Sequence, residues 1–348
     1  MRSLVHTLCA AVILTACNGS ERDRLPRSAG GQGEVLVVMG KAHWEGAPGA
    51  AVRVLLEQPV DGLPQREARF KVAHTLPSGL GSLLKTHHSV LIAQVDPDAQ
   101  PEGLLLLRDQ EAQGQLTVRL AAHRAEDLIS LVQREGGEVL DALENHQRLR
   151  VQQRLAREKD ASISSSLRAQ HGLELDVPGG YTVRTQAPRF SWLQRDRLVS
   201  GSGLDHNVIE GLLIHRHAYT SDTTFQVPYL VELRDSVTKA HVPGPDPGSF
   251  MVVQRGFEQM DLMPHGRAVS LNGSFAYVMQ GLFGMHGAKM GGPFVSLSLV
   301  DTARQELITV EGFVYAPQFD KREYMRELEA LVRTVRISGD DIPLTTKQ

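Results

Sequence analysis

The chain has 348 residues, a formal net charge of −3 at pH 7 and only two cysteines, Cys9 and Cys17. Because both cysteines lie near the N-terminus, disulfide bonds, a cysteine nucleophile and thiolate metal ligands are excluded for the rest of the chain. No basic stripe is present, which argues against a nucleic-acid partner. Beyond the N-terminal segment, no apolar run approaches the roughly 18 residues of a membrane-spanning helix.

Residues 1–16 have the composition of a secretion signal. Arg2 supplies a positive charge, and the apolar run after it, about eleven residues long, is too short to span a bilayer. The run ends in Leu14-Thr15-Ala16-Cys17, which resembles the lipobox of bacterial lipoproteins. This resemblance implies cleavage after Ala16 and acylation of Cys17. The alternative is a plain secretion signal in which Cys17 is incidental.

Acylation would hold the mature N-terminus at a membrane, because two or three acyl chains anchor a protein stably. Asn18 stands where aspartate would retain a lipoprotein at the inner membrane, so the outer membrane is favoured. Residues 17–32 are polar and contain three glycines and one proline, which predicts a flexible tether. We therefore expect a lipid-anchored protein of the cell envelope.

Residues 33–160 are expected to form a first domain with mixed strands and helices. Apolar and β-branched runs predict strands, and 3.6-residue periodicity predicts helices. The strands are expected over 33–39, 69–74, 89–95, 104–107 and 116–120, and the helices over 47–56, 79–86 and 125–157. Gly136-Gly137 interrupts the last helix, and a kink or break is expected there because each glycine costs about 1 kcal/mol relative to alanine.

Residues 161–338 are expected to form a second domain, followed by a polar tail over 339–348. Helices are expected over 162–170 and 227–241, and a loose loop over 196–206. The strands are expected over 173–177, 181–186, 190–193, 207–219, 250–254, 268–271, 275–280, 294–300 and 307–315. A last helix follows Asp320, which together with Glu323 has the spacing of a capping box. The predicted class is α+β, with two α/β sandwich-like domains, each a mainly antiparallel or mixed sheet with packed helices.

Histidines on one predicted strand are the first candidates for chemistry. His215 and His217 are two residues apart, so both side chains are expected on one face of the strand. Such a pair can bind zinc if a third ligand comes from elsewhere, and His241, His265 and His286 are candidates. The alternative is a solvated strand face. No HExxH motif is present.

Other motifs for chemistry are incomplete. Asp96 and Asp98 resemble the start of a calcium loop but lack its glycine and distal glutamate, so a turn is expected. Ser202 lies between glycines without the strand-to-helix context of a nucleophile elbow. Residues 30–33 precede a strand instead of following one, so they fail as a dinucleotide fingerprint. We expect no cofactor.

The glycine-rich segment 281–293 is a candidate partner surface. It carries Phe283, Met285, His286 and Met290 among its glycines. Apolar side chains on a pliable loop suit a partner surface or a lid. The alternative is a hairpin loop whose apolar groups fold back into the core.

Several phrases together resemble an uncharacterised lipoprotein family of Bacteroidota, domain of unknown function 4837. They are Gly33–Met39, Trp44–Gly46, Gly62–Gln65, Val242–Pro245, Met290–Phe294 and Val310–Pro317. The resemblance extends over nearly all of the mature chain and implies a secreted lipoprotein with no assigned activity and no catalytic residues. The second half also resembles the PsbP/Mog1 type of α/β sandwich, which mostly serves binding and assembly.

The function expected from the sequence is therefore that of a membrane-anchored, non-enzymatic binding or assembly module. Its partners would be the membrane, through the acyl chains on Cys17, and a protein or another envelope component. The alternative is a metal-dependent hydrolase with a histidine site around His215 and His217.

Overall fold

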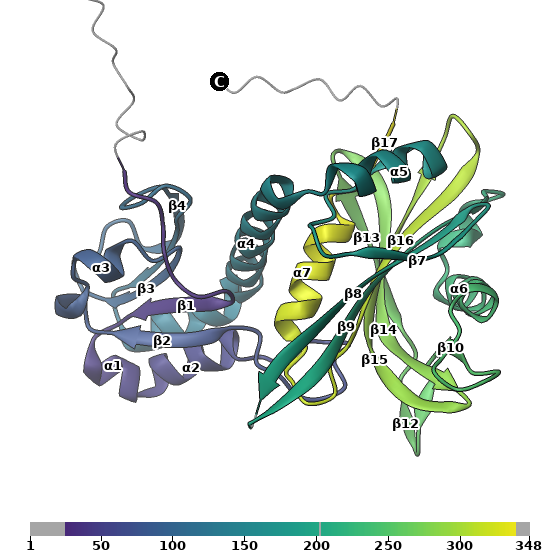
Figure 1. Ribbon diagram of the computed structural model, residues 1–348. Coiled ribbons are helices and arrows are strands. Elements are labelled where there is room, and N and C mark those ends of the chain that lie inside the picture. Colours follow the sequence, from purple (N-terminus) through teal and green to yellow (C-terminus); the bar gives the residue numbers. More distant parts are fainter. Residues whose placement is uncertain (1–24, 202, 339–348) are drawn as a thin grey trace, which may run out of the picture.

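Two sheets with a long helix between them make up the molecule (Figure 1). The computed structural model describes residues 25–201 and 203–338. The predicted signal, Cys17, Ser202 and the predicted tail over 339–348 lie outside the described residues. Within the described ranges, no helix is both long enough and apolar enough to cross a membrane.

The first sheet has the strand order β2-β1-β3-β5-β4, with β4 antiparallel to β5 and the other pairs parallel. Its strands are β1 (Glu34–Val38), β2 (Lys71–Thr75), β3 (Ser89–Val95), β4 (Gly103–Arg108) and β5 (Leu116–Ala122). The helices of this domain are α1 (Lys41–Glu45), α2 (Ala47–Leu56), the 3-10 turn η2 (Pro77–Gly79), α3 (Ser82–Lys85) and α4 (Ala125–Glu158). Apolar side chains of α2 and α4 pack on one face of the sheet against Val35 and Val37, whereas Leu36 and Val38 pack with Val90 and Leu80 in a separate cluster. Apolar contacts on both faces explain the nearly continuous apolar run of β1.

Helix α4 is continuous through Gly136-Gly137, so the break that the sequence allowed there does not occur. Gly136 instead allows close packing, because a Cβ there would lie 2.8 Å from Leu55 Cδ1 on α2. The first part of α4 belongs to the core of the first domain, whereas Val151 and Leu155 belong to the core of the second. One continuous helix therefore contributes side chains to both cores.

The second sheet is antiparallel, with the order β10-β14-β15-β16-β9-β8-β7, and β13 also pairs with β14. Its strands are β7 (Thr182–Ala187), β8 (Phe190–Gly201), β9 (Leu204–Ala218), β10 (Phe250–Val253), β13 (His265–Leu271), β14 (Ser274–His286), β15 (Ala288–Asp301) and β16 (Glu306–Tyr315). Short pairs are formed by β6 (Leu173–Glu174) with β17 (Arg336–Ile337), and by β11 (Gly256–Phe257) with β12 (Met260–Asp261). The α+β class is thus confirmed.

Helices cover both faces of the second sheet (Figure 1). They are α5 (Ala161–His171), α6 (Val227–His241) and α7 (Arg322–Val332), with the 3-10 turn η3 (Asp222–Phe225) before α6. Apolar residues of α5 and α7 form one core with the sheet, and those of α6 form another on the opposite face. Helix α7 also packs against α4 of the first domain.

Two predicted loops in the second domain are strands. Residues 196–201 belong to β8 and residues 204–206 to β9, and residues 281–293 belong to the β14–β15 hairpin with its turn at Gly287. Some of the glycines that favoured a loop allow strands to pack closely. A Cβ on Gly292, for example, would lie 2.0 Å from the carbonyl oxygen of Val314.

The N-terminus of α7 is capped from the other domain. The capping box predicted for Asp320 and Glu323 is wrong, because the N-cap residue is Lys321 and its side chain makes no cap. The backbone N–H groups of Lys321 and Arg322 instead donate to the two carboxylate oxygens of Glu67, at 2.7 and 2.8 Å. A carboxylate at this position satisfies free donors and complements the helix dipole.

Candidate functional site

The N-terminal segment is bound to the first domain over residues 26–31, which corrects the prediction of a wholly flexible tether. Gln113 N–H donates to the carbonyl of Pro26, and Ser28 N–H donates to that of Gln113, at 2.8 and 3.1 Å. The segment then passes the start of β3, where Ala29 accepts a hydrogen bond from His88 N–H at 2.8 Å. Backbone pairing thus holds this segment against the sheet.

An open cleft of about 810 Å³ lies between this segment, the β4–β5 turn and the second half of α4. Arginines from all three elements line it: Arg27, Arg108, Arg150, Arg154 and Arg157. Asp109 is the one acidic residue among the described residues that line the cleft, and its Oδ1 accepts a hydrogen bond from Gly114 N–H at 2.7 Å. The cleft is therefore strongly positive.

Most of these arginines have no acidic partner. Among residues 25–201 and 203–338, no carboxylate oxygen lies within 4.0 Å of a guanidinium nitrogen of Arg27, Arg108, Arg150 or Arg157. Arg154 differs, because it pairs with Glu158 and with Glu327 at 3.6 and 2.6 Å. Cations that face one cleft without carboxylates favour an anionic ligand.

Among the four arginines without a carboxylate partner, Arg150 is held by neutral acceptors. It is half-buried, and its Nη1 donates to Ser28 Oγ at 2.8 Å and to the Gly114 carbonyl at 3.4 Å. Burial lowers the pKa of Arg150, because removal from water disfavours the charged form. A half-buried cation with neutral partners alone weakens the fold, and such exceptions are expected at functional sites.

Two buried histidines line the floor of the cleft. His88 is 1% exposed and His146 is 4% exposed, and His146 Nε2 lies 2.9 Å from the carbonyl oxygen of His88. The ring of His88 contacts the N-terminal segment, because His88 Nε2 lies 2.8 Å from the Gly31 carbonyl oxygen. Burial, reinforced by the charge of Arg150, lowers the pKa of His88 to about 3 and that of His146 to about 4. Both rings are neutral at pH 7, so arginine supplies the positive charge of the cleft.

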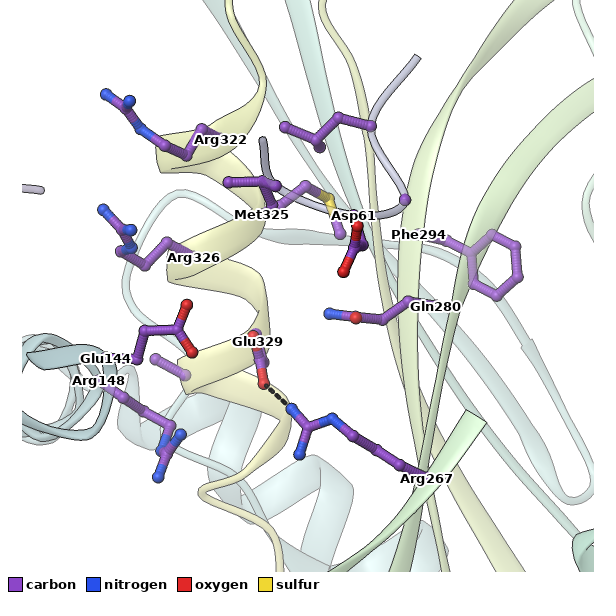
Figure 2. A pocket seen from close by; sticks show the side chains of 14 residues that line it. Asp61, Glu144, Arg148, Arg267, Gln280, Phe294, Arg322, Met325, Arg326 and Glu329 are labelled. Atoms are coloured by element: carbon purple, nitrogen blue, oxygen red, sulfur yellow. Dashed lines mark ion pairs between the residues drawn. The ribbon is translucent and has the colours of Figure 1, made fainter. Parts of the chain in front are cut away.

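A second, smaller cavity of about 90 Å³ lies between the domains (Figure 2). Arg148 of α4 and Arg267 of β13 lie on either side of Glu329 in this view, and Gln280 also points toward the space. Glu329 is already shared by Arg267 and Arg333, at 3.6 and 3.0 Å. The cavity has room for a few waters or one small ion, whereas the arginine-lined cleft has room for a larger ligand.

The predicted histidine pair does come together on strand β9. The rings of His215 and His217 have centroids 5.0 Å apart, and neither His215 Nδ1 nor His217 Nε2 has a hydrogen-bond partner. The third ligand is missing, however, because no three His, Cys, Asp or Glu side chains in the described parts of the chain are placed to hold a metal ion. No observation therefore favours the hydrolase alternative.

The candidate partner surface over 281–293 is only partly exposed. Phe283 is 2% exposed and packs edge-on against Phe313 at 5.3 Å, so it belongs to the core. Met285 and Met290 are half-buried, and His286 is exposed beside Phe250. The alternative that the apolar groups fold back into the core therefore holds for Phe283, whereas a partner surface at Met285, His286 and Met290 stays a prediction.

Asp96 and Asp98 form the expected turn, in which Asp98 N–H donates to Asp96 Oδ1 at 3.0 Å.

The arginine-lined cleft was not predicted from the sequence, although one signal for it was present. Arg150, Arg154 and Arg157 follow the i, i+4, i+7 spacing that places side chains on one face of a helix. The partners of that face come from distant segments, which the spacing cannot identify.

Two family models match the chain, one over each of its two domains. The family described as "Domain of unknown function (DUF4837)" matches residues 160–334, about half of the chain. The chain belongs to this family. A second family, described as "Domain of unknown function (DUF8532)", matches residues 28–156. The phrases Gly33–Met39, Trp44–Gly46 and Gly62–Gln65 fall in this second match, so the expectation that one family extends over nearly all of the mature chain is corrected.

Among solved structures, those of Mog1 are weakly similar to this chain. The Saccharomyces cerevisiae Ran-binding protein Mog1p is 12% identical, with a TM-score of 0.29, and the match covers 48% of this chain and 90% of Mog1p. A mutant of protein Mog1 is 13% identical, with a TM-score of 0.28, and the match covers 48% and 91% of the two chains. Likeness at this level supports no conclusion about function. No curated protein matches the chain in sequence.

Proposed function

We propose that the chain is a lipid-anchored binding protein of the cell envelope that holds an anionic ligand in the arginine-lined cleft. The observation that supports this most strongly is the group of four arginines without carboxylate partners that face one cleft of about 810 Å³. Arginine guanidinium groups bind carboxylates and phosphates through paired, charge-assisted hydrogen bonds.

The chemistry of the cleft favours binding over catalysis. Arginine stays protonated in proteins, so the five arginines are poor proton carriers at neutral pH. His88 and His146 are buried, neutral and engaged in hydrogen bonds with carbonyl groups. This arrangement suits a non-enzymatic module that recognises charge.

The anchor proposal rests on the sequence Leu14-Thr15-Ala16-Cys17, and the favoured location is the outer membrane. Cys17→Ala should abolish acylation and leave the precursor uncleaved, because the thioether can form only on the cysteine sulfur. Metabolic labelling with a fatty acid measures acylation, and the electrophoretic size of the protein measures cleavage. Cys9→Ala is the matched control and should be labelled normally. Normal labelling of the Cys17→Ala protein would refute the anchor.

Anion binding can be tested separately on the purified mature chain. Arg150→Gln should weaken the binding of inorganic pyrophosphate by about ten- to hundredfold, since a hydrogen bond to a charged group contributes about 1.5–3 kcal/mol. Thermal stability should stay the same or rise, because the substitution removes a half-buried cation without a carboxylate partner. Calorimetric titration at constant ionic strength measures the affinity, and thermal unfolding measures the stability.

Arg134→Gln is the matched control for this experiment. Arg134 lies on the same helix, its side chain is 65% exposed, and it pairs with Glu135 away from the cleft. Its replacement should leave pyrophosphate binding unchanged. Equal losses in the two variants, or no pyrophosphate binding by the unaltered protein, would contradict the proposed function.

A further inference from the structure

We infer that the ligand of the arginine-lined cleft is the anionic, phosphate-bearing headgroup of a lipid in the membrane that holds Cys17. This inference rests on the proposed function and names its ligand. Four features carry it: the position of the cleft on the chain, its charge against that of the whole protein, the exchangeable partners of Arg150, and an apolar side chain at the cleft.

The cleft lies close to the anchor along the chain. Arg27 lines the cleft and follows Cys17 by ten residues. A fully extended chain spans at most about 3.3–3.6 Å per residue, so Arg27 lies within about 35 Å of the acylated residue. Because residues 26–31 are paired to the first domain, this limit on distance applies to the cleft as well as to Arg27.

The positive charge of the cleft differs from the negative net charge of the whole protein. Attraction to an anionic membrane would therefore come from the cleft. The chain has a formal net charge of −3, so an anionic bilayer repels most of its surface. Near such a surface each arginine gains about 1 kcal/mol, and the effect falls off within a Debye length. Four arginines without carboxylate partners on one cleft therefore favour one orientation, with the cleft toward the headgroups.

Arg150 has neutral hydrogen-bond acceptors that phosphate oxygens could replace. Its guanidinium donates to Ser28 Oγ and the Gly114 carbonyl, both of which belong to the cleft lining. A phosphate that replaces these acceptors forms stronger, charge-assisted hydrogen bonds. The exchange costs Ser28 its hydrogen bond from Arg150, but Arg27 of the N-terminal segment lines the same cleft, so an anion that contacts Arg27 and Arg150 should stabilise that segment against opening.

Leu149 supplies the contact that distinguishes a lipid from a free anion. Its side chain is 41% exposed and lines the same cleft as the arginines. Apolar surface beside a cationic site fits the glycerol backbone and first methylene groups of a phospholipid. A purely ionic ligand would leave this leucine in water, at a loss of the hydrophobic contact.

The test measures occupancy of the cleft in the acylated full chain. Membrane association alone would not be informative, because the acyl chains anchor the protein in any bilayer. The protein is reconstituted in phosphatidylcholine vesicles, in vesicles that also contain phosphatidylglycerol, and in vesicles with the same negative charge from oleate. Hydrogen exchange at the amides of Ser28 and Ala29, which are bonded to Gln113 and Thr86, reports on the segment. Phosphatidylglycerol should slow exchange about tenfold, the effect of a local ligand concentration near ten times Kd.

Arg150→Gln should abolish this protection, and Arg134→Gln should retain it. Protection in the Arg150→Gln protein, or equal protection by oleate, would overturn the assignment of a phosphate headgroup at this site. Inorganic phosphate added to phosphatidylcholine vesicles separates the two proposals. Protection by free phosphate without protection by phosphatidylglycerol would overturn the lipid inference and leave the anion-binding function standing. Protection by neither would overturn both.

Discussion

Replacing Arg234 by methionine should lower the free energy of unfolding by about 3–5 kcal/mol, because it leaves a buried carboxylate without its cation. Arg234 of α6 is 3% exposed and Glu311 of β16 is 1% exposed. They form two hydrogen bonds, from Nε to Oε2 at 2.8 Å and from Nη2 to Oε1 at 2.7 Å. Burial raises the pKa of Glu311, and the charge of Arg234 opposes that rise. Urea unfolding at pH 7 measures the change.

The double variant Arg234→Met/Glu311→Leu is the control for this prediction. Replacing a whole buried ion pair by apolar side chains is often neutral or stabilising, so the double variant should recover most of the loss. Arg234→Met should also be less destabilised at pH 5 than at pH 7, because Glu311 can then take up a proton. A loss below about 1 kcal/mol at pH 7 would show that the pair is not buried as described.

Mild acid should destabilise the protein before its carboxylates titrate. Four histidines are almost fully buried, and burial lowers the pKa of His88 and His215 to about 3 and that of His146 and His171 to about 4. In the unfolded chain their pKa returns to about 6.5, so the unfolded state binds more protons below that pH. Stability is therefore complete above pH 6.5 and falls toward pH 4. Each histidine contributes up to about 1.4 kcal/mol per pH unit.

Chemical unfolding at pH 7.0, 6.0 and 5.0 measures this slope. His215→Gln should flatten it by up to about 1.4 kcal/mol per pH unit, since His215 is 4% exposed and its Nδ1 has no hydrogen-bond partner. His286→Gln, at an exposed position, should leave the slope unchanged. A stability that stays constant between pH 7 and 5 would show that these imidazoles are accessible to protons in the folded state.

Local sequence patterns correctly predicted the helices and strands whose buried residues recur with a regular period along the chain. The ranges predicted for α2, β3 and α6 coincide with the structure, because each has an apolar face that faces one core throughout. The prediction was wrong where a residue type served a non-local contact. Gly136 allows Leu55 to approach α4, and Gly292 allows the carbonyl of Val314 to approach β15. In both places the sequence pattern indicated a break or loop, and the partner that explains the glycine lies elsewhere in the chain.

The sequence by itself determined the class of fold, the positions of most helices and strands, and the lipobox pattern on which the anchor proposal rests. These features depend on neighbouring residues and on burial with a regular period. Only the tertiary structure decided that Glu67 caps α7, that the histidine pair lacks a third ligand within the described residues, and that Arg27, Arg108 and Arg150 line one cleft. The reason is topological: these contacts join segments up to roughly 250 residues apart, whose pairing follows from strand order and domain packing, and no local period encodes it.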